Sequence, residues 1–293
     1  MGHNCEPMSE TSSSPIEHYE NFPVASWLCP PRLRPPIAAI YHFARTADDI
    51  ADEGNDSAEQ RLSDLAAYRA DLHSVAAGQT PSTRWSQVFK PLDAQMKAFH
   101  LPLQPLDDLL SAFAQDVVKS RDGAAYADMA ELLDYCSRSA NPVGRLLLHL
   151  YGVNKQEALM ESDAICTALQ LINFWQDLSV DIPRGRYYLP LAECAAHGVF
   201  ISDPARQFPQ LQQSKEVTRL IAHCVQGARA QMQAGAPLVH RVHGRAGWEL
   251  RAVVQGGLRI LDKIAAIDFA TLTRRPTLGK ADVPYILWQM IRM

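Results

Sequence analysis

The stretch IYHFARTADDIADE, residues 40–53, carries the pattern from which the rest of this chain can be interpreted. It holds four acidic residues within six positions: Asp48, Asp49, Asp52 and Glu53. Because helix positions four apart share one face, Asp48 and Asp52 point the same way, with Arg45 one turn before them. Neighbouring carboxylates repel each other unless a cation lies between them, and Mg²⁺ joins carboxylates to substrate phosphates. The pattern indicates a magnesium site, with a solvated acidic turn as the alternative.

A second polar stripe lies in NFWQDLSVD, residues 173–181. Asn173, Asp177 and Asp181 recur every four residues, so they also share one helix face and all offer oxygen ligands. The remaining positions are largely apolar, which favours a stripe facing a cavity over a solvated helix face. Arg184 and Arg186 follow at once. Two helices with oxygen ligands and nearby arginines together favour a diphosphate held by Mg²⁺.

The composition excludes several other classes of protein. The 293 residues carry a net charge of −4, which gives no electrostatic footprint for nucleic acid. The six cysteines include no C-x-x-C pair, so we expect reduced thiols in the cytoplasm rather than zinc or disulfides. No apolar run approaches the roughly 18 residues of a membrane span, and the first residues lack the pattern of a signal peptide.

Hydrophobic periodicity predicts helices and no strand, so we expect one all-α domain over residues 14–293 behind a disordered tail at 1–13. Ser14 with Pro15, and later Ser57, are typical of helix starts. Pro91 is expected to break one helix and Pro142 to kink another. The predicted helices span residues 15–27, 36–53, 58–77, 81–100, 105–119, 129–151, 155–181, 190–197, 204–210, 214–234, 246–266 and 282–292.

Three further stretches leave alternatives open. Small residues in 135–144 suit either an apolar ligand or close helix packing. Arginines and a lysine recur late in the chain and could reach a second phosphate or remain solvated: Arg245, Arg251, Arg259, Arg274, Arg275 and Lys280. The terminal VPYILWQMIRM could lie on a lipid surface or close the core, and we favour the core. The sequence lacks a P-loop, a G-x-G-x-x-G loop after a strand and paired Glu-x-x-His motifs, so no nucleotide or di-iron site is expected.

Together the two acidic motifs resemble those of the squalene, dehydrosqualene and phytoene synthases, over about residues 17–275. The run after Asp181, with Gly185, Arg186 and Tyr188-Leu189-Pro190, also resembles that family, whereas Asn141-Pro142 departs from its pattern. HYENFPVAS at 18–26 and NFWQD at 173–177 resemble the hydroxysqualene synthases of bacterial hopanoid biosynthesis. Gln176 and Val180 stand where relatives that join two diphosphates usually carry Arg and often Glu.

The resemblance implies a helical bundle around a central apolar cavity, and presqualene diphosphate as the substrate. Ionisation of this substrate, rearrangement and capture by water would give hydroxysqualene, with two or three Mg²⁺ ions and no NADPH. It implies metal ligation by Asp48, Asp52, Asn173, Asp177 and Asp181. Catalytic roles fall to Tyr41, Arg45 and Tyr188. Substrate contacts fall to Arg45, Arg186, Phe22, Phe43, Tyr135, Val143, Gly144, Phe174 and Gln176, and Trp175 is a further candidate wall of the cavity.

The main alternative within the family is condensation of two farnesyl or geranylgeranyl diphosphates to presqualene diphosphate, dehydrosqualene or phytoene. A non-catalytic isoprenoid-binding relative is disfavoured because all five metal ligands are kept, and an all-α phosphohydrolase because no His-Asp pairs occur. Lipid-soluble substrate and product also imply transient contact with the inner face of a membrane and with neighbouring enzymes of the squalene pathway.

Overall fold

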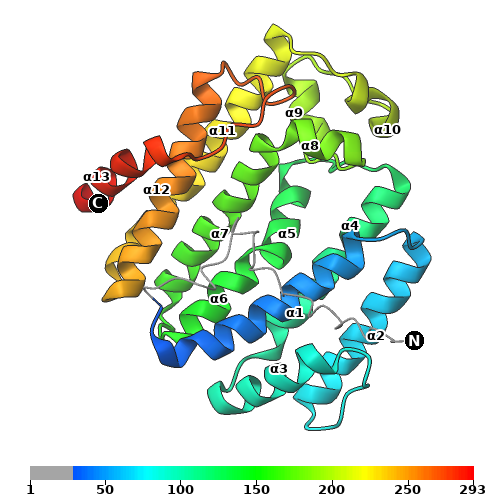
Figure 1. Cartoon of the computed structure of the whole chain (residues 1–293). Helices are drawn as coiled ribbons and strands as arrows, with labels where there is room; N and C mark the ends of the chain where they lie inside the picture. The colour runs from blue at the N-terminus through cyan, green and yellow to red at the C-terminus, as the bar shows by residue number, and fades with distance from the viewer. Residues whose placement is uncertain (1–28) are drawn as a thin grey trace, which may run out of the picture.

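The computed structural model describes residues 29–293. The predicted tail at 1–13, the predicted helix at 15–27 and the candidate contact Phe22 therefore lie outside the described residues. Within the described part every regular element is a helix, which confirms the all-α prediction (Figure 1). The longer helices are α1 (Arg34–Asp52), α2 (Ala58–Ala76), α3 (Ser86–Phe99), α4 (Leu103–Asp122), α5 (Met129–Ser139), α6 (Asn141–Leu150), α7 (Gln156–Gln176), α11 (Lys215–Gly235), α12 (Arg245–Ala266) and α13 (Val283–Arg292). Shorter helices are α8 (Leu178–Asp181), α9 (Leu191–Ala196) and α10 (Pro204–Gln207).

Helix α7 lies in the middle of the bundle, with α5, α6, α11 and α12 packed around it (Figure 1). One hydrophobic core joins these helices, and a second core joins α1 to α2, α3 and α4. The acidic end of α1 and the acidic end of α7 therefore belong to different cores, and the site forms where the two cores meet.

Two prolines act differently from what the sequence predicts. Pro91 lies inside α3 without ending it, because it falls in the second turn and removes one backbone hydrogen bond near the helix start. Pro142 separates α5 from α6, where one kinked helix is predicted over 129–151. As it cannot donate a backbone hydrogen bond to the preceding turn, the helix stops, and Pro142 occupies the first turn of the next one.

The predicted helix 155–181 ends five residues early, at Gln176, and α8 follows after Asp177. The backbone N–H of Ser179 donates to the carbonyl of Thr271 at 3.0 Å. This bond takes the N–H of Ser179 away from the helical ladder, so the chain from a distant part of the sequence interrupts the helix. The interruption turns Asp177 and Asp181 relative to Asn173.

The terminal helix α13 lies on the outer side of α12, at the edge of the molecule (Figure 1). The prediction that this segment closes the core is wrong, because most of its large apolar side chains are exposed and only Met290 is buried. No helix in residues 29–293 is long and apolar enough to cross a membrane.

Candidate active site

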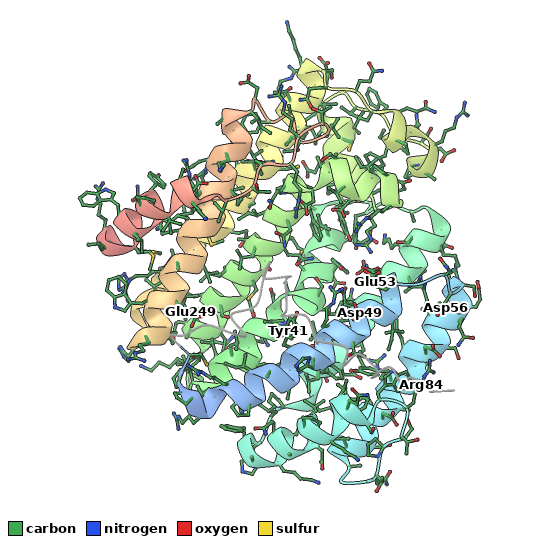
Figure 2. The ribbon with its side chains drawn as sticks, in the orientation of Figure 1. Tyr41, Asp49, Glu53, Asp56, Arg84 and Glu249 are labelled. Atoms are coloured by element: carbon green, nitrogen blue, oxygen red, sulfur yellow. The ribbon has the colours of Figure 1, made fainter. Side chains whose placement is uncertain are left out.

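One face of α1 carries a charged half and an apolar half. Ile37, Tyr41, Arg45, Asp48 and Asp52 follow one another at spacings of three and four residues, so they lie along one stripe of the helix. Arg45 Nη1 donates to Asp48 Oδ2 at 3.1 Å, and its Nη2 lies 2.7 Å from Asp49 Oδ1. Figure 2 shows Tyr41 partway along α1, with Asp49 and Glu53 toward its acidic end. Arg45 is thus the first counter-charge of this acidic motif.

The second acidic motif is paired with a guanidinium from the segment after α12. Arg275 contacts both carboxylate oxygens of Asp177, with Nε 2.6 Å from Oδ1 and Nη2 3.0 Å from Oδ2. Such a two-point contact fixes the planar guanidinium in orientation as well as in position. Asn173 lies one turn earlier on α7 and is partly exposed.

Arg186 joins the two motifs. It forms an ion pair with Asp52 on α1, and its charge also acts on Asp48, Asp116 and Asp181. Its position follows from Gly185, whose φ of 75° ends the short helical turn at 182–184 and returns the Arg186 N–H to the carbonyl of Asp181 at 3.0 Å. The two aspartate motifs therefore face a common cation.

The carboxylates of both motifs have too few positively charged neighbours to balance their own charge. Burial, and then the neighbouring Asp52, raise the pKa of Asp48 to about 6, although Arg45 and Arg186 lower it. Burial also raises the pKa of Asp181 to about 7, and Asp177 raises it further, against the lowering effect of Arg186. Crowded carboxylates of this kind are stabilised by an added cation.

The oxygen ligands of the two motifs suit Mg²⁺, which keeps several of its waters, better than a metal ion coordinated only by protein side chains. Among residues 29–293, no three His, Cys, Asp or Glu side chains lie close enough to surround a metal ion. Each motif instead offers a pair of carboxylates, and α7 adds the amide oxygen of Asn173. Mg²⁺ usually keeps several waters and binds through one or two carboxylates plus phosphate oxygens, which suits such an incomplete set.

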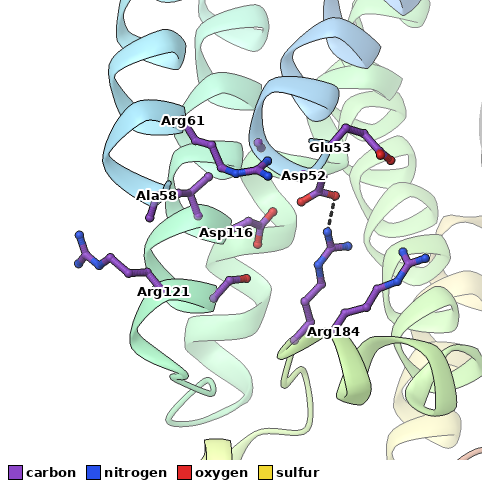
Figure 3. Close-up of a pocket in the computed structure, with 11 residues that line it drawn as sticks. Asp52, Glu53, Ala58, Arg61, Asp116, Arg121 and Arg184 are labelled. Atoms are coloured by element: carbon purple, nitrogen blue, oxygen red, sulfur yellow. Dashed lines mark ion pairs between the residues drawn. The ribbon is translucent and has the colours of Figure 1, made fainter. Parts of the chain in front are cut away.

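A polar pocket of about 540 Å³ lies between α1, α2, α4 and the loop at 184–186. Figure 3 shows Asp52 and Asp116 beside it, with Arg184 projecting from the loop. Its lining includes four arginines: Arg61, Arg121, Arg184 and Arg186. The pocket combines the carboxylates that a metal needs with the guanidinium groups that a polyanion needs.

An aromatic cluster lies behind the polar pocket. Tyr188 stacks on Phe174 with ring centroids 3.8 Å apart and an interplanar angle of 11°, and Tyr135 lies near both. Burial raises the pKa of Tyr188 and of Tyr135 well above the ordinary value, so both phenols are neutral. The structure brings these three predicted residues together.

The expectation that Phe43 contacts substrate is corrected by its position. Phe43 is fully buried in the second core, where it stacks on Tyr68 and packs against Phe89. It follows Tyr41 by two positions, which turns its side chain to the opposite side of α1. Trp175 is likewise completely buried, in the first core.

An apolar cavity of about 130 Å³ lies between α6, α7 and α12 and is closed by the start of α1. Val143 and Gly144 line it, as predicted, together with Ile37 of α1 and Leu169 of α7. A Cβ on Gly144 would lie 2.4 Å from Ser162 Oγ and 2.6 Å from Cys166 Sγ, so glycine permits α6 to approach α7. The expectation of close helix packing is therefore confirmed at Gly144, which also lines the apolar cavity.

The match to known proteins agrees with this geometry. The squalene/phytoene synthase family model matches residues 17–282. The chain belongs to the squalene/phytoene synthase family. It is 33% identical over 256 residues to the hydroxysqualene synthase of Sinorhizobium fredii, covering 87% of this chain and 81% of the relative. Identity to the hydroxysqualene synthase of Rhodopseudomonas palustris is also 33%, over 275 residues, with 89% and 84% covered.

Solved structures of relatives share the fold. The crystal structure of squalene synthase HpnC from Alicyclobacillus acidocaldarius matches with a TM-score of 0.75 and 34% identity, covering 86% of this chain and 90% of that one. A dehydrosqualene synthase in complex with a ligand matches with a TM-score of 0.76 at 18% identity, covering 90% and 88%, and supports the fold alone.

In this squalene/phytoene synthase, Gln176 is turned toward the segment after α12. Its Nε2 donates to the carbonyl of Pro276 at 2.7 Å, the side chain is buried, and it lines neither of the two cavities described above. The expected direct contact between Gln176 and substrate is therefore replaced by an indirect role. The bond holds Pro276 beside α7 and so holds Arg275 over Asp177.

One residue of the site is missed by sequence reasoning on this family member. Asp116 of α4 lines the polar pocket and accepts a hydrogen bond from the Tyr135 hydroxyl at 2.6 Å. Burial raises the pKa of Asp116 to about 7, although Tyr135 and Arg186 lower it. The available signal is a lone carboxylate between the buried Ala112 and Val117. Arg275 is named from the sequence among the late basic residues that could reach a second phosphate, but its pairing with Asp177 has no local signal, because the two residues lie 98 positions apart.

Proposed function

We propose that this chain is a hydroxysqualene synthase. The reaction is Mg²⁺-dependent ionisation of presqualene diphosphate, rearrangement of the resulting cation, and capture by water to give hydroxysqualene and diphosphate. Hydroxysqualene would then serve as an intermediate in hopanoid biosynthesis. Because capture by water delivers no hydride, the reaction needs no NADPH.

The observation that supports this proposal is that one stripe of α1 and one stripe of α7 each have an apolar half and a charged half. On α1 the stripe begins at Ile37 in the apolar cavity and ends at Asp52 in the polar pocket. On α7 the stripe begins at Ser162 and Leu169, in the same cavity, and leads to Asn173 and Asp177. This succession of charged and hydrocarbon walls matches the chemistry of a substrate with a diphosphate head and apolar arms.

The charged half would bind and orient the diphosphate. Asp48, Asp52, Asn173, Asp177 and Asp181 would hold Mg²⁺, which when bound neutralises charge on the leaving diphosphate. Arg186 and Arg45 are placed to donate to the phosphate oxygens, and Arg275 adds a third guanidinium at Asp177. These residues would thus supply both the metal ligands and the direct donors.

The aromatic cluster would protect the cation that ionisation leaves behind. The cluster of Phe174, Tyr188 and Tyr135 would supply negative π density to a carbocation bound beside it, and its burial excludes bulk water. The raised pKa of Tyr188, caused by burial, keeps its phenol protonated, so no phenolate is present to trap the cation.

Capture by water adds the water oxygen to the cation, and the proton must go to a base beside the cation. Because the cation forms next to the leaving group, the departing diphosphate would accept this proton. Glu249 is the sole carboxylate among the described residues that line the apolar cavity, but it lies at the Ile37 end, about 22 Å along α1 from Asp52, and is too far away to do so.

Replacement of Glu249 by Gln tests where the proton goes. We expect Glu249→Gln to leave the ratio of alcohol to hydrocarbon unchanged, because Glu249 lies at the far end of the stripe from the cation. A roughly tenfold fall in the alcohol fraction would show instead that Glu249 accepts the proton.

A second candidate function is condensation of two farnesyl diphosphates. The observation in its favour is the arginine-rich wall of the polar pocket, where Arg61, Arg121 and Arg184 lie in addition to Arg186. These guanidinium groups could bind a second diphosphate. The position of Gln176 argues against this condensation, because its amide donates a hydrogen bond to Pro276 and presents no charge to a second diphosphate.

The deciding experiment supplies each substrate separately. Purified protein is incubated with Mg²⁺ and presqualene diphosphate without nicotinamide, and the organic extract is analysed by mass spectrometry. Hydroxysqualene with oxygen from labelled water is the expected product. Consumption of farnesyl diphosphate, with presqualene diphosphate left unchanged, would establish the condensation instead.

A further inference from the structure

An exposed group of apolar side chains covers the outer side of α12 and α13. We call it the C-terminal apolar surface, and each member is at least 40% exposed: Trp248, Val283, Tyr285, Leu287, Trp288 and Ile291. Five of these six residues lie on the ten-residue helix α13. Single exposed apolar residues are normal on proteins, but a contiguous group marks an interaction site.

Helix α13 carries apolar side chains on both its inner and its outer side. Met290 is buried and Ile286 half-buried against α12, one turn apart on the inner side. Val283, Leu287 and Ile291 follow each other at four-residue spacing on the outer side, with Trp288 beside them. The inner side accounts for the packing of α13, whereas the outer side is apolar without contributing to the core.

Polar contacts hold α13 firmly, so the exposed side is not the result of a loosely placed helix. Asp282, just before α13, accepts from Arg259 Nε at 2.7 Å and from Lys263 Nζ at 2.6 Å, both on α12. At the far end, Gln255 Nε2 donates to Met293 Sδ at 3.3 Å. The apolar face is therefore held outward by contacts at both ends.

Positive charge accompanies this surface. Residues 245–293 contain eight Lys or Arg and four Asp or Glu, whereas the whole chain has a net charge of −4. Three arginines lie over the exposed aromatic rings: Arg251 over Trp248 at 4.8 Å, Arg259 over Tyr285 at 4.8 Å and Arg292 over Trp288 at 5.8 Å. Aromatic rings with Arg or Lys at their edge are typical of the headgroup level of a membrane.

The surface also lies beside the apolar cavity. Trp248 is exposed, and its neighbours Glu249 and Leu250 line the cavity, as do Ala246 and Val253 of the same helix. Figure 2 shows Glu249 on the segment of α12 that borders α6 and α7. The first turns of α12 thus connect an exposed apolar face to a buried apolar wall.

We propose that the C-terminal apolar surface docks on a lipid bilayer that contains anionic headgroups. Trp288, Leu287 and Ile291 would enter the boundary between headgroups and acyl chains, and the basic residues beside the exposed rings that are not paired with Asp177 or Asp282, among them Arg251 and Arg292, would contact lipid phosphates. The charge excess of this segment in an acidic chain selects an anionic lipid surface over a second copy of the chain. Docking in this orientation brings the cavity-lining turns of α12 close to the bilayer.

Vesicle binding by the full chain tests the proposal without any substrate, so its outcome is independent of the proposed reaction. Protein is sedimented with vesicles of phosphatidylcholine alone and of phosphatidylcholine mixed with phosphatidylglycerol. We expect binding to the anionic vesicles that weakens with salt. The variant Trp288→Gln/Ile291→Gln should lower the vesicle affinity at least about tenfold, because two inserted apolar side chains are lost.

Phe200→Gln is the matched control, because Phe200 is 76% exposed but lies outside the C-terminal apolar surface. This variant should bind vesicles like the wild type. Equal binding by the wild type and by Trp288→Gln/Ile291→Gln would overturn the proposal, as would a lack of wild-type binding. Light scattering supplies a further check, since a wild-type dimer that the double variant loses, without vesicle binding, would identify a second copy as the occupant.

Discussion

At the scale of single residues, each carboxylate of the two acidic motifs that is paired has an arginine as its partner. Arg45 contacts Asp48, Arg186 contacts Asp52, and Arg275 contacts Asp177. Each arginine is thus next to a carboxylate that the proposed reaction assigns to Mg²⁺. Binding of a metal and a diphosphate would transfer the guanidinium groups from carboxylate oxygens to phosphate oxygens.

The carboxylates themselves give the first prediction. Asp48→Ala and Asp177→Ala should each lower turnover at least about 100-fold, because each removes a metal ligand that the substrate-binding half depends on. Both variants should remain folded by circular dichroism, since neither residue packs in a core. Asp93→Ala, which removes a half-buried partner of Lys97 on α3, far from both acidic motifs, serves as a control. Near-normal turnover in either site variant would contradict the metal assignment.

Arg275 gives a prediction of opposite sign. Because its guanidinium occupies both oxygens of Asp177, Arg275→Ala should tighten the binding of Mn²⁺ to the substrate-free protein, by roughly 3- to 10-fold. The affinity for inorganic diphosphate in the presence of Mg²⁺ should fall at the same time. Calorimetric titration measures both quantities. The exposed neighbour Arg274 provides the control, and weaker Mn²⁺ binding in Arg275→Ala would show that this arginine does not compete with the metal.

At the scale of elements, distant segments decide where helices stop and what their ends can bind. The carbonyl of Thr271 interrupts the helix at Asp177, and the carbonyl of Pro276 binds Gln176. The segment between α12 and α13 is therefore part of the second aspartate motif, although the paired residues lie as far as 98 and 100 positions apart in sequence. The stability of this segment depends on the packing and hydrogen bonds that attach α13 to α12.

Asp282 gives the element-scale prediction. It is buried and accepts hydrogen bonds from Arg259, Lys263 and the N–H of Gly279, which lower its pKa below the ordinary range. Asp282→Asn should therefore loosen α13 and speed amide hydrogen exchange in 283–292, while exchange in α2 stays unchanged. Exchange monitored by mass spectrometry separates the two regions. Equal protection of α13 in variant and wild type would show that its apolar packing alone is sufficient.

The parts of the fold that the sequence predicts are those controlled by neighbours along the chain. Asp48 with Asp52, and the helix start at Ser57, follow from spacings within one or two turns, and the structure has both. Phe43 is misassigned because the sequence does not reveal which side of α1 the second core covers. Arg275, Asp116 and the break at Asp177 depend on contacts from other helices, which helical periodicity does not encode.

At the scale of the whole molecule, two cores enclose a set of underpaired carboxylates, and this should be visible in stability. The pKa values of Asp48, at about 6, and of Asp116 and Asp181, at about 7, lie above the ordinary 3.8, with burial as the main cause. The folded protein therefore holds protons that the unfolded chain releases. Stability from these groups is present near pH 4 and is lost as the pH rises toward about 7.

Thermal unfolding of metal-free protein tests this sign. The melting temperature of the wild type should fall between about pH 4 and about pH 7, and the fall should be smaller in Asp116→Asn, which removes one group with a raised pKa. Added Mg²⁺ should reduce the fall in both proteins, since it supplies the missing charge. A melting temperature that rises through this range equally in both proteins would contradict the raised pKa values.

The stripe of α1 also defines a length between its apolar and its charged end. Ile37 and Asp52 lie about 22 Å apart along the helix axis, given the rise per residue of an α-helix. In the proposed reaction, a diphosphate bound at the Asp52 end would extend a hydrocarbon arm toward the wall that Ile37 and its neighbours form. The longest arm would then be set by the number of helical turns between the two residues, and a bulkier side chain at position 37 would shorten it.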